Sequence, residues 1–285
     1  MRHLLSIRDL SASDLRTILD LSTAPFTQAL RNQGVALYFE KPSARTRNSM
    51  EMAAAQLGGH PVYLQPAELG IGERESVADV TRTLACYHAI IAARVFDHYL
   101  LEQMAAVNAA PVLNMLSATD HPLQALADLL TIEQLLGSLE GKRIAFVGEA
   151  NNVARSLADA CCLAGAELIM ASPPGFGFGG PLPAVHQIDD PFEAVEAADI
   201  VYTDVWVSMG GEDNDERREL FEPYRVDEAL MARAPSAWFL HCLPARRGEE
   251  VTAPVIDGPR SAVWRQAANR MHTARGAMLW RLGQD

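Results

Sequence analysis

The stretch Ser43-Ala44-Arg45-Thr46-Arg47 stands between an apolar run at residues 35–39 and an alanine-rich run at residues 49–57. We expect the first run to form a buried strand and the second a helix that ends at Gly58, so the stretch fills a strand-to-helix turn. A helix N-terminus presents unpaired backbone N–H groups and the positive end of the helix dipole. Two hydroxyls and two arginines at such a turn predict a site for a phosphate-like dianion. A capped helix start with solvated arginines is the alternative.

Strand-like and helix-like segments alternate along the first half of the chain. A first helix opens at Ser11, which forms a capping-box pattern with Asp14. The expected strands lie at residues 60–64, 89–93 and 111–115, and the expected helices at 76–86, 100–107 and 125–136. This alternation predicts a parallel sheet with helices on both faces, in which ligands bind at the carboxyl ends of the strands. Arg94 and residues 117–121 fall at such ends.

A second series follows a linker at residues 137–141. Its expected strands lie at 143–148, 167–171, 200–203 and 238–240, and its expected helices at 152–163, 192–197 and 266–282. The turn Gly148-Glu149-Ala150-Asn151-Asn152 has one glycine where a dinucleotide fingerprint needs several, which disfavours a nicotinamide oxidoreductase. The asparagine pair is suited to bind a carboxylate or to cap the helix. We expect loops at residues 173–183 and 211–218.

Composition excludes several classes of partner. The net charge of −12 disfavours nucleic acid and anionic membranes, which require a basic face. No apolar run reaches the roughly 18 residues of a membrane span. The first residues carry charge too early for a secretory signal, so we expect a cytoplasmic protein. The four cysteines show no CxxC spacing and are expected to be reduced thiols, with no metal site.

Six short motifs are spread along the chain. In order they are Ser43 to Arg47 (SxRTR), Arg94 at a strand end, His121 to Gln124 (HPxQ), Asp204 to Gly210 (DVWVSMG), His241 to Pro244 (HCLP) and Asn269 to His272 (NRMH). Together they resemble the motifs of the aspartate and ornithine carbamoyltransferases. The fourth and fifth are typical of the ornithine enzymes. Because order and spacing agree over nearly the whole chain, the set is far more specific than any single motif.

The resemblance implies an α/β fold of two Rossmann-like parallel-sheet domains with the active site in the interdomain cleft. It implies a carbamoyl-phosphate-binding domain at residues 1–136 and an ornithine-binding domain at 137–264. It also implies that a C-terminal helix at 265–285 packs back on the first domain. A homotrimer or a multiple of trimers is implied as well, and we expect no cofactor.

The resemblance further implies transfer of the carbamoyl group of carbamoyl phosphate to the δ-amine of ornithine, giving citrulline and phosphate in arginine biosynthesis. The predicted catalytic residues are Arg94, His121, Cys242 and Arg270, with Cys242 as a lining thiol that does not attack. The predicted carbamoyl phosphate site comprises Ser43, Ala44, Arg45, Thr46, Arg47, Arg94, His121, Gln124, Cys242, Leu243 and Arg270. The predicted ornithine site comprises Asn152, Asp204, Ser208 and Met209.

The sequence departs from the family pattern in three places. Gly70 stands where the family usually has a glutamine that reaches the phosphate of a neighbouring subunit. Glu149 replaces the usual aspartate, which is a mild change. Residues 172–189 are loop-like where the family usually has a further helix. This last departure leaves open whether the second domain loses stability or exposes its sheet.

Alternatives to the anabolic reaction remain at this point. The chain could use another amine acceptor, such as putrescine or an acylated ornithine, or run citrulline phosphorolysis. Asp204 favours an acceptor with a free α-ammonium. The residues do not distinguish citrulline synthesis from citrulline phosphorolysis. A catalytically weak binding subunit is a further alternative, but clustered cations without a ligand repel one another.

Overall fold

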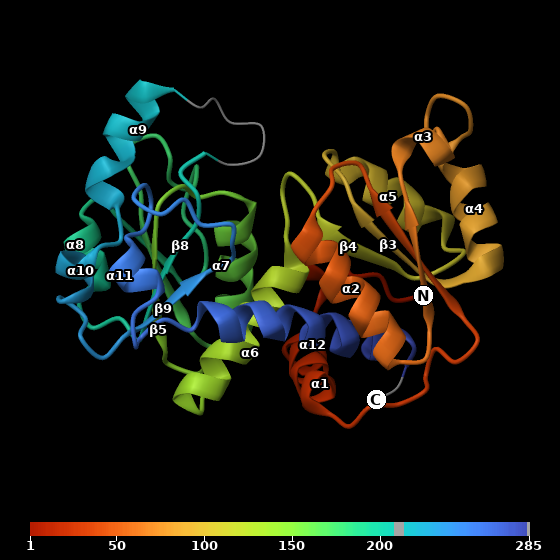
Figure 1. Cartoon of the computed structure of the whole chain (residues 1–285), viewed down its shortest axis with the longest axis horizontal. Coiled ribbons are helices and arrows are strands. Elements are labelled where there is room, and N and C mark those ends of the chain that lie inside the picture. The colour runs from red at the N-terminus through yellow and green to blue at the C-terminus, as the bar shows by residue number, and fades with distance from the viewer. Residues whose placement is uncertain (208–213, 284–285) are drawn as a thin grey trace. The chain divides into compact units, whose positions relative to one another are not determined.

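The computed structural model describes residues 1–207 and 214–283, which divide into two compact units. Unit 1 comprises residues 1–126 and 270–285, and unit 2 comprises residues 127–269. Each unit is built on its own sheet, and every strand pairing within these sheets is parallel (Figure 1). The α/β class predicted from the alternating segments is therefore confirmed. In the described ranges, no helix combines the length and apolar character needed to cross a membrane.

Unit 1 contains a four-stranded sheet in the order β2-β1-β3-β4. Its elements are η1 (Ile7–Asp9), α1 (Ala12–Thr23), β1 (Gly34–Phe39), α2 (Ala44–Gln56), β2 (His60–Leu64), α3 (Pro66–Leu69), α4 (Val77–Tyr87), β3 (His88–Arg94), α5 (His98–Val107), β4 (Val112–Leu116) and the start of α6 (Pro122–Leu136). Alternate side chains of β1 and β3, such as Ala36 and Ile91, pack on α4 and α5. Helix α2 packs on β1 and β2, and the Ser11–Asp14 capping box of α1 is confirmed.

The last part of α12 (Val263–Arg281) belongs to unit 1. Arg275 Nη2 donates to the Ser22 carbonyl at 2.6 Å, and Trp280 Nε1 donates to Asp14 Oδ1 at 2.9 Å. A Cβ atom on Gly276 would lie 2.5 Å from the Ile18 carbonyl oxygen. Only glycine therefore allows α12 to approach α1 this closely.

Unit 2 contains a five-stranded sheet in the order β7-β6-β5-β8-β9. Its elements are β5 (Arg143–Val147), α7 (Asn152–Ala164), β6 (Glu167–Ala171), β7 (Val185–Ile188), α8 (Pro191–Val195), β8 (Ile200–Thr203), α9 (Asp215–Phe221), η2 (Glu222–Tyr224), α10 (Glu228–Met231), β9 (Trp238–His241) and α11 (Ala253–Ile256). One face of the sheet packs on α8, α10 and α11, and α7 lies on the other side (Figure 1).

Two loop predictions in unit 2 were wrong in part. Strand β7 falls within the 172–189 segment, because its backbone pairs with β6 from Leu168 to Ala171. Helix α9 occupies the second half of the predicted 211–218 loop, and its first half lies outside the described residues. The described residues between β6 and β7 form no helix, and a hollow of about 710 Å³ lies there, lined in part by Ile169 and Val185. Beside this hollow, Leu168 to Ala171 of β6 are at most 2 % exposed, whereas the edge strand β7 is only partly covered.

Candidate active site

The signature turn of unit 1 is the N-terminus of α2. Ser43 is the N-cap, and its hydroxyl accepts the backbone N–H of Thr46 at 3.4 Å. Ala44 and Arg45 are the first two helical residues, so their N–H groups have no intrahelical carbonyl acceptor. Thr46 is 3 % exposed, and its hydroxyl accepts from Ser43 Oγ at 3.2 Å and from Arg94 Nη1 at 3.4 Å. The turn therefore joins helix donors, hydroxyls and a guanidinium, as an anion site requires.

Two like charges meet beside this turn. Burial and, second, the charge of Arg45 lower the pKa of Arg94. Within residues 1–207 and 214–283, neither of these two arginines forms an ion pair with a carboxylate. Arg94 Nε is also buried without a hydrogen-bond partner. Uncompensated guanidinium groups at a helix N-terminus are stabilised by a bound anion.

His121 and Arg270 form the next part of the cluster. Arg270 Nη1 donates to His121 Nε2 at 2.9 Å and to Gln124 Oε1 at 2.7 Å, and all three side chains are at most 9 % exposed. Burial, then Arg270, then Arg94 hold the pKa of His121 well below 6.5. The imidazole is therefore neutral. Because a guanidinium can only donate, Nε2 accepts, and we assign the ring proton to Nδ1.

Arg47 is engaged differently from the other predicted phosphate ligands. Its Nε lies 2.7 Å from Glu51 Oε1, one helical turn away. Its guanidinium lies over the Tyr63 ring, 4.0 Å from the centroid. The structure therefore unites Ser43, Thr46, Arg45, Arg94, His121, Gln124 and Arg270, whereas Arg47 pairs with a carboxylate. A direct contact between Arg47 and phosphate stays a prediction.

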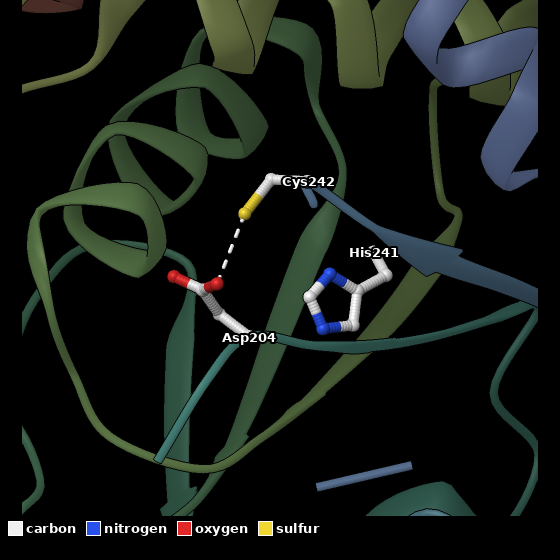
Figure 2. Close-up of side chains that lie close together, drawn as sticks. All are labelled: Asp204, His241 and Cys242. Atoms are coloured by element: carbon white, nitrogen blue, oxygen red, sulfur yellow. Dashed lines mark hydrogen bonds between the residues drawn. The ribbon is translucent and has the colours of Figure 1, made fainter. Parts of the chain in front are cut away.

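In unit 2, the carboxylate of Asp204 is the centre of the predicted ornithine site. It is 8 % exposed, and it accepts from Asn151 Nδ2 at 2.8 Å, from Val205 N at 2.8 Å and from the Cys242 thiol at 3.0 Å (Figure 2). Asn151 is also the N-cap of α7, and Asn152 is the first helical residue. Both oxygens of Asp204 are thus oriented by donors. The predicted residues Ser208 and Met209 lie outside the described residues.

The thiol of Cys242 donates to the Asp204 carboxylate, and its role as a lining group stays a prediction. The next residue, Leu243, has a φ of 61°, a left-handed conformation that non-glycine residues adopt at a cost. Its N–H donates to His241 Nδ1 at 2.9 Å, and His241 Nε2 lies 3.0 Å from Glu250 Oε1. The loop that carries Cys242 and Leu243 is therefore fixed by a buried histidine–glutamate pair.

Asp204, His241 and Cys242 lie close enough to suggest a metal site, since their potential ligand atoms all lie within 4.8 Å of one another. However, both ring nitrogens of His241 are engaged, one as an acceptor from Leu243 and the other with Glu250. A metal would need one of those nitrogen lone pairs. The cluster fits an amino-acid site better than a metal site.

Comparisons with known proteins match a family model to each half of the chain. The carbamoyl-P binding domain of aspartate/ornithine carbamoyltransferase matches residues 2–134, and the Asp/Orn binding domain matches residues 140–281. The chain belongs to the aspartate/ornithine carbamoyltransferase family. It is 44 % identical to an ornithine carbamoyltransferase of Hyperthermus butylicus, over 97 % of this chain and 96 % of that one.

Two further comparisons within this family involve Pyrococcus furiosus. The chain is 40 % identical to an anabolic ornithine carbamoyltransferase of that organism, over 99 % of this chain and 96 % of the relative. It also resembles a solved ornithine carbamoyltransferase structure from the same organism, with a TM-score of 0.94, 39 % identity, and coverage of 100 % and 98 %. The ornithine enzymes are thus similar to this chain along its whole length.

The loop that departs from the family pattern is a tight turn. Gly70 has a φ of 58° and ends α3, and a Cβ atom there would lie 2.9 Å from the Cβ of Arg74. Gln65 donates its N–H to the Glu68 carboxylate at 2.7 Å. Arg74 Nη2 donates to the Glu68 carbonyl. The polar residues of this loop therefore stabilise the loop itself.

Sequence reasoning missed the residues that orient the predicted ligands. The sequence predicts a helix cap or a carboxylate binder at Asn151, and in the structure its amide also orients Asp204, 53 residues away. Glu250 and Gln266 were not identified, although Gln266 Oε1 accepts the N–H of His241 at 2.9 Å. No local motif marks these contacts, because each joins residues from separate segments.

Proposed function

We propose that this chain is an ornithine carbamoyltransferase working in the anabolic direction. It would transfer the carbamoyl group of carbamoyl phosphate to the δ-amine of ornithine and release citrulline and phosphate. The observation that supports this proposal most strongly is the cluster in unit 1, where Arg94 and Arg270 lie beside a neutral buried His121 and Arg45 lies close to Arg94. Such a cluster suits a dianionic phosphate next to a carbonyl that acquires negative charge.

In this proposal the phosphate binds at the N-terminus of α2. The N–H groups of Ala44 and Arg45, the hydroxyls of Ser43 and Thr46, and the Arg45 guanidinium would neutralise it. Arg47 would join them only by leaving Glu51. The anion would relieve the repulsion between Arg45 and Arg94.

The carbamoyl oxygen would lie against Arg94 and His121. When the amine attacks the carbonyl carbon, negative charge develops on this oxygen, and preorganised donors stabilise it. His121 would donate its Nδ1 proton, since Nε2 accepts from Arg270. Gln124 Oε1 can accept a carbamoyl N–H in addition to its bond from Arg270. The prediction that the carbonyls of Cys242 and Leu243 also orient the carbamoyl amide concerns unit 2 and stays a prediction.

Ornithine would bind in unit 2 through its α-amino acid group. The Asp204 carboxylate would pair with the α-ammonium, since its orientation is fixed by Asn151 and Val205. Asn152, at the positive end of α7, would donate to the α-carboxylate. This chemistry favours ornithine over putrescine, which lacks a carboxylate, and over an acylated ornithine, which lacks the charged ammonium.

The proton balance needs no dedicated protein base. The neutral δ-amine forms a C–N bond to the carbamoyl carbon, and the bond from that carbon to the phosphate oxygen breaks. The departing phosphate can take the amine proton, so that citrulline and hydrogen phosphate leave. Positioning and charge stabilisation would then supply much of the rate.

A homotrimer in the cytoplasm completes the proposal. Unit 1 exposes several large apolar side chains, among them Tyr87 at 70 %, Tyr99 at 60 % and Phe96 at 50 %. If these side chains form one contiguous patch, such a patch favours contact with another protein surface. Light scattering on the purified protein should give a mass three times the 31.0 kDa of the chain, or a multiple of that mass if trimers associate further. A mass of one chain would contradict the trimer.

The reaction itself is tested by product stoichiometry. Incubation with carbamoyl phosphate and ornithine should release citrulline and phosphate in equal amounts, above the spontaneous breakdown of carbamoyl phosphate. The His121→Ala variant is the matched control, because it removes the proposed Nδ1–H donor and leaves the rest of the cluster in place. Phosphate release without citrulline would contradict the proposal.

A further inference from the structure

We propose that Arg217 is a positioning residue for the amino-acid half-site of unit 2. Its single guanidinium joins the loops that follow β5, β6 and β8, and thereby fixes the carboxylate of Asp204. This inference rests on the proposed function, because it names a residue that would determine ornithine affinity without touching ornithine.

Arg217 contacts four neighbouring groups of unit 2. Its Nε donates to the carbonyl oxygen of Trp206 at 2.7 Å, and its Nη2 lies 2.8 Å from Glu149 Oε2. The guanidinium carbon lies 4.9 Å from the ring centroid of Phe176 and 5.3 Å from that of Phe221. The side chain is only 11 % exposed. Arg217, a residue of the short helix α9, thus contacts a backbone carbonyl, a carboxylate and two aromatic rings at the same time.

Two of these contacts lead to Asp204. Trp206 lies two residues after Asp204. The hydrogen bond from Arg217 to the Trp206 carbonyl therefore fixes the backbone on the C-terminal side of Asp204. Glu149 lies two residues before Asn151, whose amide donates to Asp204 Oδ2 at 2.8 Å and whose Oδ1 caps α7. Arg217 therefore contacts both the segment that carries Asn151 and the segment that carries Asp204, the two partners of this hydrogen bond.

The third contact fixes the loop after β6. Phe176 accepts the N–H of Ala150 through its carbonyl at 2.8 Å, which attaches that loop to the turn before Asn151. The Arg217 guanidinium lies over the Phe176 ring, and Phe176 in turn packs edge-on against Phe221 with centroids 4.9 Å apart. All three loops leave the carboxyl ends of their strands, where ligands of parallel sheets bind.

Arginine is suited to this task, and lysine is not. A planar guanidinium donates in several directions while its faces stack on aromatic rings, whereas an ammonium is a compact point charge. Lysine could pair with Glu149 or reach the Trp206 carbonyl, but it could not reproduce both contacts and the stacking. The Arg217→Lys variant therefore retains charge and loses the geometry.

A purely structural brace is the competing explanation, and it predicts a different result. Loss of a brace would lower the melting temperature and the amount of active protein, with both substrates affected alike. Loss of a positioning residue would weaken ornithine binding selectively, because a displacement of about 1 Å in an active site costs up to a hundredfold. The two explanations therefore differ in the ratio of the two KM values.

The experiment compares the wild type with Arg217→Lys, Arg217→Met and the control Arg233→Met. Arg233 also pairs with a glutamate of unit 2, Glu196, but both side chains are more than half exposed. For each protein, KM for ornithine, KM for carbamoyl phosphate, kcat and the melting temperature are measured. L-norvaline, which keeps the α-amino acid group and lacks the δ-amine, is titrated calorimetrically in the presence of carbamoyl phosphate.

We expect both Arg217 variants to raise the ornithine KM and the norvaline Kd by about tenfold or more, with Arg217→Met the more affected. The carbamoyl phosphate KM should stay within about twofold of the wild type, and Arg233→Met should behave as the wild type. Equal changes in both KM values, or an unchanged norvaline Kd, would overturn the inference. If Arg217→Met does not fold, the two KM values and the norvaline Kd of Arg217→Lys decide between the positioning role and the structural brace.

Failure of the proposed function gives a distinct result. A wild type that makes no citrulline but binds norvaline would refute the proposed reaction, and the norvaline Kd of the variants would still decide the role of Arg217. A wild type that binds no norvaline would overturn both.

Discussion

Replacement of Asp204 by Asn tests the division of labour between the two units. The substitution preserves the size of the side chain and removes its negative charge. In the proposed site this charge pairs with the α-ammonium of ornithine, whereas carbamoyl phosphate makes no contact with it. Ornithine affinity should therefore fall while carbamoyl phosphate affinity stays nearly unchanged.

The magnitude follows from the surroundings of Asp204. The carboxylate is 8 % exposed, so the loss of its charged hydrogen bond to the ammonium is only weakly compensated by water. A hydrogen bond to a charged group contributes about 1.5–3 kcal/mol, which corresponds to a rise of roughly ten- to 150-fold in the ornithine KM.

Local geometry adds to this loss. The new NH2 group would face a donor, because Asn151 Nδ2 and Val205 N both donate to the carboxylate. Asn151 cannot reverse its amide without giving up its Oδ1 bonds to Val153 and Ala154, which cap α7. The rise in KM should therefore lie in the upper half of that range.

The assay is steady-state citrulline formation, with each substrate varied while the other is saturating. The melting temperature is measured in parallel, to separate a binding defect from a loss of folded protein. An ornithine KM within twofold of the wild type, or equal rises in both KM values, would refute the reasoning.

Three further predictions concern unit 1. Arg94→Ala should lower kcat by about a hundredfold or more, because it removes a donor to the carbamoyl oxygen, with little change in melting temperature; unchanged turnover would remove Arg94 from the site. His121 stays neutral in the folded protein, whereas an unfolded chain protonates it near 6.5, so folding free energy is lost as pH falls below that value. At pH 5.5 this loss should be on the order of 1 kcal/mol, and urea unfolding at pH 5.5 and 7.5 should show it reduced in His121→Asn; an identical pH dependence would contradict the assignment. Gly70→Gln should cost about 1–2 kcal/mol of unfolding free energy, because φ is 58° and Arg74 blocks the new Cβ; a more stable variant would contradict this.

Much of the fold could be predicted because local signals agree with the tertiary structure. Ser11 and Asp14 form the capping box that their spacing indicates, and the buried apolar runs form the central strands. The two mistaken loops lack such signals. Strand β7 reads Val-His-Gln-Ile, and only its pairing with β6 identifies it as a strand. Helix α9 is rich in charge, and packing of Phe221 and Arg217 stabilises it.

The candidate site was predicted at the level of residue types and less well at the level of contacts. Motif positions named Arg94, His121 and Arg270, and the structure brings these residues together. From the sequence alone, the Arg47 side chain could either pair with Glu51, one helical turn away, or turn toward the predicted phosphate site. Spacing does not distinguish these two positions, and the structure shows the pair with Glu51. Spacing also could not show the Asn151–Asp204 bond, which depends on the parallel pairing of β5 with β8.

The most direct test of the central claim is carbamoyl transfer from carbamoyl phosphate to four acceptors assayed in parallel: ornithine, putrescine, N-acetylornithine and aspartate. The account predicts strong turnover with ornithine alone, because only ornithine offers a δ-amine together with the α-ammonium for Asp204 and the α-carboxylate for Asn152. Preferential turnover of another acceptor would contradict the assignment of unit 2. Binding of carbamoyl phosphate without turnover of any acceptor would contradict the claim that this chain is a catalyst.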